Sequence, residues 1–107
     1  MSFHAFDVAL EMIGQLRQPL AAIAQHDPDL AQQLRRAAAS VPLNLSEGRR
    51  RSGRDRMHLW RVAAGSADEV VAILGVAQAW GHVESASIAP ALASCDRVLA
   101  MLWRLTH

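Results

Sequence analysis

The stretch LWRVAAGSADEVVAILGVAQAW, residues 59–80, decides the fold of this chain. Apolar residues recur in it at alternating steps of four and three, which is the spacing along one face of an α-helix. The row consists of Leu59, Ala63, Ser66, Val70, Ile73, Ala77 and Trp80. A neighbouring row that starts at Trp60 is also apolar, so we expect a helix over about 53–80 that is buried on more than one side.

A third row on the same helix is made of small residues and one acid. It contains Gly65, Asp68, Ala72, Gly75 and Ala79. A glycine inside a helix costs roughly 1 kcal/mol relative to alanine. Two glycines on one face favour close approach by another helix, and sequence drift is the alternative.

The ends of this helix carry turn signals. Upstream, Ser52 precedes Asp55 by three residues, which is the spacing of a capping box. Downstream, Gly81 is expected to end the helix. A last helix follows over about 85–106, with Pro90 expected in its first turn, where amide donors have no intrahelical acceptor.

Two helices are expected before residue 53. The first covers about 3–25, and Pro19 is expected to kink or break it. The second covers about 28–47, starts from an Asp27 cap, contains a kink at Pro42 and stops at Gly48. Short connections make successive helices neighbours, so the sequence predicts a single all-α domain over 1–107, an antiparallel up-down four-helix bundle.

Composition narrows the class of protein further. The 107 residues include a single cysteine, Cys95, so no intramolecular disulfide can form. The N-terminal stretch has acids within its apolar part, unlike a signal peptide, and the longest uncharged run, 70–83, is too short to span a bilayer. We therefore expect a cytoplasmic protein without a membrane partner, and its small size favours an oligomer.

Positive charge is concentrated in one part of the chain. Eight of the eleven arginines lie within 35–61, which carries +6, while the remainder carries −5. Five of them surround the turn between the second and third helices: Arg49, Arg50, Arg51, Arg54 and Arg56. Such a cluster either binds the phosphates of RNA or DNA without reading sequence, or is a solvated turn. Base stacking has little support, because Trp60 is the only nearby aromatic residue.

A polar row on the second helix points away from that helix's own apolar row. It consists of Arg36, Ser40, Asn44 and Glu47, with Leu43 on the same side. The row is either a solvated face or a contact with another helix or subunit. In the second interpretation Ser66 pairs with Asn44 or Glu47, and Glu69 joins a network that fixes the geometry of assembly.

Residues for catalysis are missing from the sequence pattern. There is no Gly-rich phosphate loop and no GxSxG, the five histidines are scattered, and the two Glu-x-x-His pairs of a di-iron bundle are absent. We therefore expect no catalytic residue, no metal site, no cofactor and no small-molecule substrate. Cys95 falls in an apolar row and is expected to be a small core residue.

The segments QLRRAAASVPLNLSEGRRRSGRD and LWRVAAGSADEV together resemble the bacterial family of 23S rRNA intervening-sequence proteins, which are helical bundles. The positions that carry the resemblance include Arg36, Ser40, Asn44, Glu47, Gly48, Gly65, Ser66 and Glu69. It implies a homopentameric ring. A similar bundle is the accessory protein of diversity-generating retroelements, which works with a reverse transcriptase and its RNA.

These observations favour a non-enzymatic homo-oligomer. The expected role is a scaffold or accessory protein associated with RNA or with a nucleic-acid enzyme through the Arg-rich turn. The alternative is a protein–protein interaction scaffold without any nucleic acid.

Overall fold

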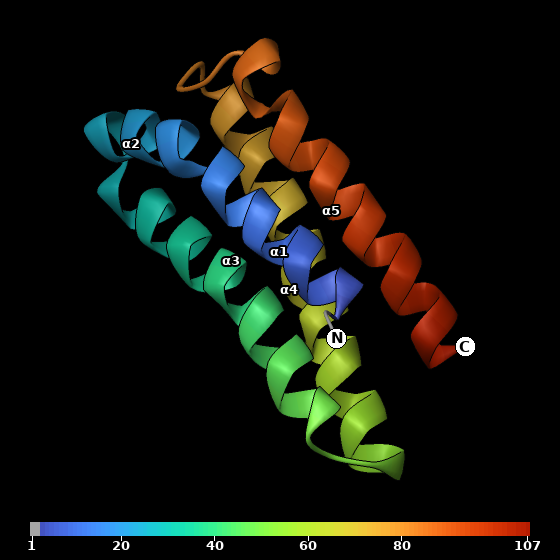
Figure 1. The fold of residues 1–107 in the computed structure, drawn as a ribbon. Helices are drawn as coiled ribbons and strands as arrows, with labels where there is room; N and C mark the ends of the chain where they lie inside the picture. The colour runs from blue at the N-terminus through green and yellow to red at the C-terminus, as the bar shows by residue number, and fades with distance from the viewer. Residues whose placement is uncertain (1–2) are drawn as a thin grey trace.

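The computed structural model describes residues 3–107, and every regular element within them is an α-helix (Figure 1). The helices are α1 (His4–Gln15), α2 (Arg17–His26), α3 (Pro28–Arg49), α4 (Gly53–Ala79) and α5 (Ser85–Thr106). The all-α class is confirmed. The expected set of four helices is wrong in number, because the segment predicted as one helix over 3–25 forms α1 and α2.

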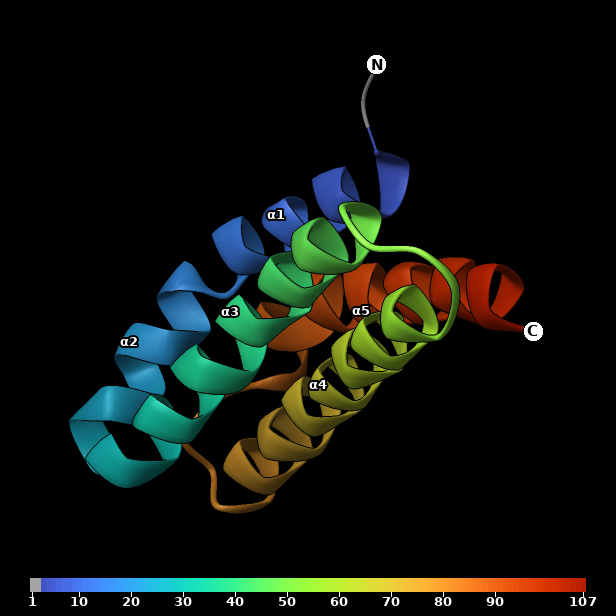
Figure 2. The ribbon, with the colours of Figure 1, turned by 90° about the horizontal axis from the view of Figure 1, so that it is seen from below.

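The break between α1 and α2 follows from Pro19, which lies in the first turn of α2. Proline has no amide hydrogen, so it cannot bond to the carbonyl four residues earlier, at Gln15. On either side of this gap, the Leu16 amide bonds to the carbonyls of Met12 and Ile13, at 3.0 and 3.1 Å, and the Leu20 amide bonds to the Leu16 carbonyl at 2.8 Å. Figures 1 and 2 show α2 turning away from the line of α1.

The start of α3 agrees with the sequence, and its end does not. The Leu30 amide donates to the Asp27 carboxylate at 3.0 Å, with Pro28 at the first helical position. The helix continues through Pro42 and past Gly48 to Arg49. Gly48 is therefore not the residue that ends the helix, and its role is described below.

Both ends of α4 are built around glycines. Gly53, with φ +58°, is its first residue, and Ser52 makes no side-chain capping bond, so the predicted capping box does not form. At the other end Gly81 has φ +81°. Its amide bonds to the Gln78 carbonyl and the His82 amide to the Ala77 carbonyl, both at 2.9 Å, which closes the helix as a Schellman motif.

Buried residues from all five helices form one hydrophobic cluster in a body of 42 × 22 × 22 Å. In cross-section α1 packs on α3 and α5, α4 packs on both α3 and α5, and α2 packs mainly on α3 (Figure 2). The largest side chains with almost no exposure include Met12, Leu34, Leu45, Leu74 and Leu102. Cys95 lies in this core, as expected, and burial raises the pKa of its thiol to about 11.

Two expectations about individual residues are wrong, and a third concerns a helix contact that the protomer itself does not make. Trp80, predicted in the core, is 71% exposed, because it forms the C-cap at the end of α4. Pro90 is the sixth residue of α5, one turn later than expected. The small row of α4 is exposed, and a Cβ built on Gly65 or Gly75 would have no neighbour within 4 Å, so no helix of the described protomer approaches it.

Helix α4 is long and apolar enough, by length and composition alone, to cross a membrane, with a mean hydropathy of 1.3 over its best window. One side of it, including Ala67, Val70 and Leu74, is packed in the core. A core helix of a soluble protein has the same properties, so this is weak evidence for a membrane span.

Candidate nucleic-acid and subunit interface

The arginines of the turn between α3 and α4 fall into two groups. Three of them make contacts within the chain. Arg51 donates to the Glu47 carboxylate at 2.7 and 3.1 Å. The guanidinium carbon of Arg49 lies 5.3 Å from the centre of the Phe3 ring. The side chains of Arg50 and Arg54 are exposed and form no hydrogen bond or ion pair within residues 3–107.

Arg56 is the third arginine with contacts inside the chain, and it closes the end of α3. Its guanidinium donates to the Gly48 carbonyl at 3.2 Å and to the Arg49 carbonyl at 3.0 Å. It also lies 5.3 Å from the ring centre of Trp60. The last carbonyls of a helix have no intrahelical partner and form the negative end of its dipole, so a cation there stabilises the helix. Arg56 is thus a structural residue as well as part of the basic cluster.

Gly48 is required by the close approach of α4. A Cβ at this position would lie 2.6 Å from both Cδ1 and Nε1 of the Trp60 indole, closer than real contacts allow. That indole is 6% exposed and donates from Nε1 to the Leu45 carbonyl at 3.2 Å. Sequence reasoning missed this contact, because a glycine followed by a basic turn also has the pattern of a helix end. It also means that Trp60 is too buried to stack on a base.

A small hydrogen-bond network joins the middle of α3 to α4. The Asn44 amide donates to Oγ and to the carbonyl of Ser40, both at 2.9 Å, and Ser66 Oγ donates to Ser40 Oγ at 2.8 Å. All three residues are partly buried. Ser66 therefore pairs across the helix interface, which was one of the two alternatives for this row, but its partner is Ser40 rather than Asn44 or Glu47.

The charged members of the predicted network remain apart. Arg36 and Glu69 are exposed and form no ion pair within the described residues, while Glu47 pairs with Arg51 in the next turn of the chain. The network of Arg36, Asn44, Glu47 and Glu69 is thus not formed inside the protomer. A single chain leaves these charges available at its surface.

Large apolar side chains are exposed beside these charges. Leu43 is 67% exposed, Val62 37% and Val76 45%. Leu43 shares its side of α3 with Arg36, and Val62 and Val76 lie seven residues before and after Glu69, on one side of α4. Such a mixed patch is typical of a surface that contacts another protein.

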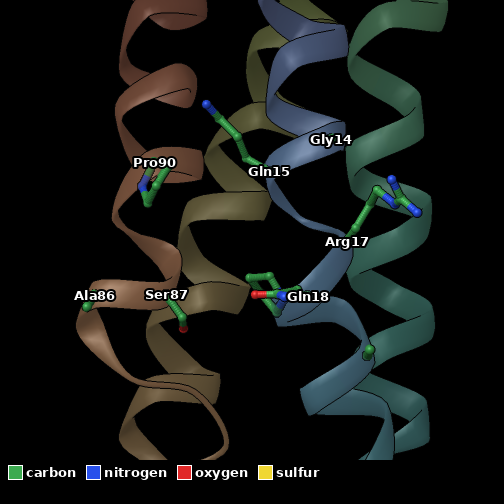
Figure 3. Close-up of a pocket in the computed structure, with 9 residues that line it drawn as sticks. Gly14, Gln15, Arg17, Gln18, Ala86, Ser87 and Pro90 are labelled. Atoms are coloured by element: carbon green, nitrogen blue, oxygen red, sulfur yellow. The ribbon is translucent and has the colours of Figure 1, made fainter.

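A hollow of about 750 Å³ lies at the break between α1 and α2 and is also lined by α5 (Figure 3). Gln15, Gln18, Ser87 and Pro90 are among the residues around it, and Figure 3 shows Arg17 extending away from Pro90 toward α3. Gln15 accepts a hydrogen bond from Ser94 at 2.6 Å. No acid lines the hollow, so it contains no pair of groups suited to acid–base chemistry. Within residues 3–107, no three His, Cys, Asp or Glu side chains converge as metal ligands.

Comparison with known proteins agrees with this architecture. The chain is similar to a protein of unknown function from the S23 ribosomal protein family of Bacteroides thetaiotaomicron VPI-5482, with a TM-score of 0.86 and 14% identity over 95% of this chain and 97% of that one. At this identity the likeness shows the fold. None of the curated proteins matches the chain.

The family model described as "23S rRNA-intervening sequence protein" matches residues 4–104, which is nearly the whole chain. The match covers all five helices up to the last turn of α5, including the motif residues of α3 and α4. The chain therefore belongs to the 23S rRNA-intervening sequence protein family.

Proposed function

We propose that the protein is a non-enzymatic, cytoplasmic scaffold that assembles with copies of itself, with a ring of five as the form that the family resemblance implies. The observation that supports assembly is the surface around the motif. Arg36 and Glu69 have no ion pair in the described protomer, and Leu43, on the same side of α3 as Arg36, is 67% exposed. Burying these groups against another subunit removes apolar surface from water and pairs the charges.

Assembly is tested by light scattering coupled to size-exclusion chromatography. The wild-type mass should be a multiple of the protomer mass, and Glu47→Ala and Leu43→Asp should both lower it. Leu43 is too exposed for its loss to disturb the core, so it separates assembly from folding. A wild-type protein that stays at protomer mass at every concentration contradicts the proposal.

A second role, contact with RNA or DNA, is supported by Arg50 and Arg54. Both are exposed without an ion pair in the described chain. Arg54 also lies in the first turn of α4, where the helix dipole disfavours a cation, so helix stability does not explain it. In an oligomer the pair would be repeated on every copy, and the repeated contacts would add avidity.

Titration of labelled single-stranded RNA at two salt concentrations tests this role. Binding should weaken steeply as salt rises, because each neutralised phosphate releases counterions. The variant Arg50→Ala/Arg54→Ala should bind RNA more weakly than wild type. The control is Arg104→Ala, which removes an exposed arginine of α5 and should leave binding unchanged. Absence of binding at low salt, or equal binding by both variants, would leave the protein-interaction scaffold as the function.

A further inference from the structure

An apolar groove runs between the broken first helix and α3. It consists of two adjoining hollows of about 380 and 300 Å³ that share Arg17, Leu20 and Arg35. Leu34 and Ala38 lie in its floor, and Arg17 and Arg35 stand on its two helical walls. No acid lines either hollow, and neither arginine forms an ion pair within the described residues.

The outer side of α4 has the complementary properties. Val62, Gly65, Glu69, Ala72 and Val76 follow one another at steps of three, four, three and four, and all are exposed. These are the positions that form the contact seam of two packed helices. The seam has valines at its ends, small residues that let a helix approach closely, and one acid at its centre. We call this row the α4 seam.

We propose that the α4 seam of one copy lies in the groove of the next copy, with Glu69 between Arg17 and Arg35 of its neighbour. The inference rests on the oligomer proposed above and names its two contact surfaces. Charge complementarity selects a second copy as the occupant: the groove has two arginines and no acid, and the seam has one acid and no base.

Glu69 and Arg35 lie at similar positions along the long axis of the protomer, as this contact requires. The bond from Ser66 to Ser40 fixes the register of α4 against α3. Glu69 lies about one turn beyond Ser66, and Arg35 lies about one turn before Ser40 on the oppositely directed α3. Rotation about an axis along the body keeps every residue at its height, so Glu69 of one copy reaches the level of Arg35 in the next.

The two surfaces are different parts of one protomer. The groove is lined by residues of α1, α2 and α3, whereas the seam belongs to α4, which packs on α3 and α5 (Figure 2). A contact between two different surfaces is head-to-tail, and such contacts form a ring when the rotation between copies closes. The ring of five implied by the family resemblance is one such closed arrangement.

Charge reversal tests the contact in the full-length protein. Arg35→Glu and Glu69→Arg should each raise the dissociation constant of the oligomer about tenfold or more, measured by light scattering over a dilution series. The double variant Arg35→Glu/Glu69→Arg restores an opposite pair between positions 35 and 69, while Arg17 remains unpaired, so it should associate more strongly than either single variant. Asp96→Arg and Arg104→Glu, both exposed on α5, are the charge-matched controls and should leave the mass unchanged.

A steric variant provides a second, uncharged test. Ala72→Trp fills the centre of the exposed seam and should dissociate the oligomer while circular dichroism shows unchanged helix content. An oligomeric wild type whose mass resists Arg35→Glu or Ala72→Trp would overturn this contact and leave the oligomer proposal standing. A double variant that associates no more strongly than the single variants would also overturn the contact alone. A wild type that is monomeric at all concentrations would overturn both proposals.

Discussion

Two glycines of the family motif occupy opposite environments, and the contrast separates what holds the chain together from what it presents to others. Gly48 is buried where α3 meets α4, with no room for a Cβ beside Trp60. Gly65 is on the outer side of α4 with open space around it. The residues of one sequence motif are thus divided between an inner contact, which shapes the protomer, and an outer surface available to a partner.

The inner contact between α3 and α4 depends most on Trp60. Removing this side chain should have the largest effect on the stability of the protein. Trp60→Ala should lower the free energy of unfolding by about 3–5 kcal/mol, because it leaves a cavity and removes the bond to the Leu45 carbonyl. Trp80→Ala, at a tryptophan that is 71% exposed, is the matched control and should change it by less than about 0.5 kcal/mol. Urea unfolding followed by circular dichroism measures both. Equal effects at the two tryptophans would refute the assignment of Trp60 to the core.

Replacing Gly48 or Gly65 by alanine should give the next largest change in stability, and the two changes should have opposite signs. Gly48→Ala should destabilise the protein by about 1–3 kcal/mol, because the indole against it is buried and hydrogen-bonded and cannot move freely. Gly65→Ala should stabilise the protomer by up to about 1 kcal/mol, since alanine is the better helix former and meets no neighbour. Urea midpoints at low protein concentration measure the difference. A shift of the same sign in both variants would contradict the contrast.

Arg54 and Arg56 extend the comparison to the basic turn. Arg56→Ala should cost about 1–2 kcal/mol of stability, because it removes two charge-assisted bonds to the carbonyls at the end of α3. Arg54→Ala should leave stability within about 0.5 kcal/mol of wild type and, if the turn contacts RNA, weaken that binding. Thermal unfolding and the RNA titration together measure this. If Arg54→Ala is the more destabilising variant, the division of the turn into structural and free arginines is wrong.

The sequence predicts regular helices well and their contacts less well, for physical reasons that differ from residue to residue. Periodicity and caps place α3, α4 and α5 within about two residues of their observed ends, because these signals are local. Pro19 marks a discontinuity, but whether it kinks or breaks a helix depends on what the next segment packs against. Gly48 has the same local sequence as a helix end, and only the indole from residue 60 shows why it is glycine.

In the candidate site, too, local features could be predicted from the sequence, whereas contacts between helices could not. The pairing of Ser66 across the interface was predictable because both polar rows are regular, whereas the choice of Ser40 as partner depends on the register of two helices. The groove lined by Arg17 and Arg35 could not be predicted from the sequence, since it exists only when α2 folds back beside α3. The roles of Arg50 and Arg54 could be separated from that of Arg56 only through the carbonyls at the end of α3.

The smallest expected effect is the contribution of the buried Cys95 thiol to the pH dependence of stability. Its titration tests whether the core is closed to solvent. Burial raises the pKa of its thiol to about 11 from 9.0, so the folded protein keeps a proton that the unfolded chain releases between these values. Stability contributed by the neutral thiol is complete below pH 9 and declines as pH rises toward 11. Between pH 8 and pH 10 the free energy of unfolding of the wild type should fall by about 1 kcal/mol more than that of Cys95→Ala. The comparison with the variant removes the contribution of the other titrating groups, which are the same in both proteins. If the two proteins show the same pH dependence, or if a thiol reagent labels Cys95 in the native state at pH 8, the thiol is not sealed in the core.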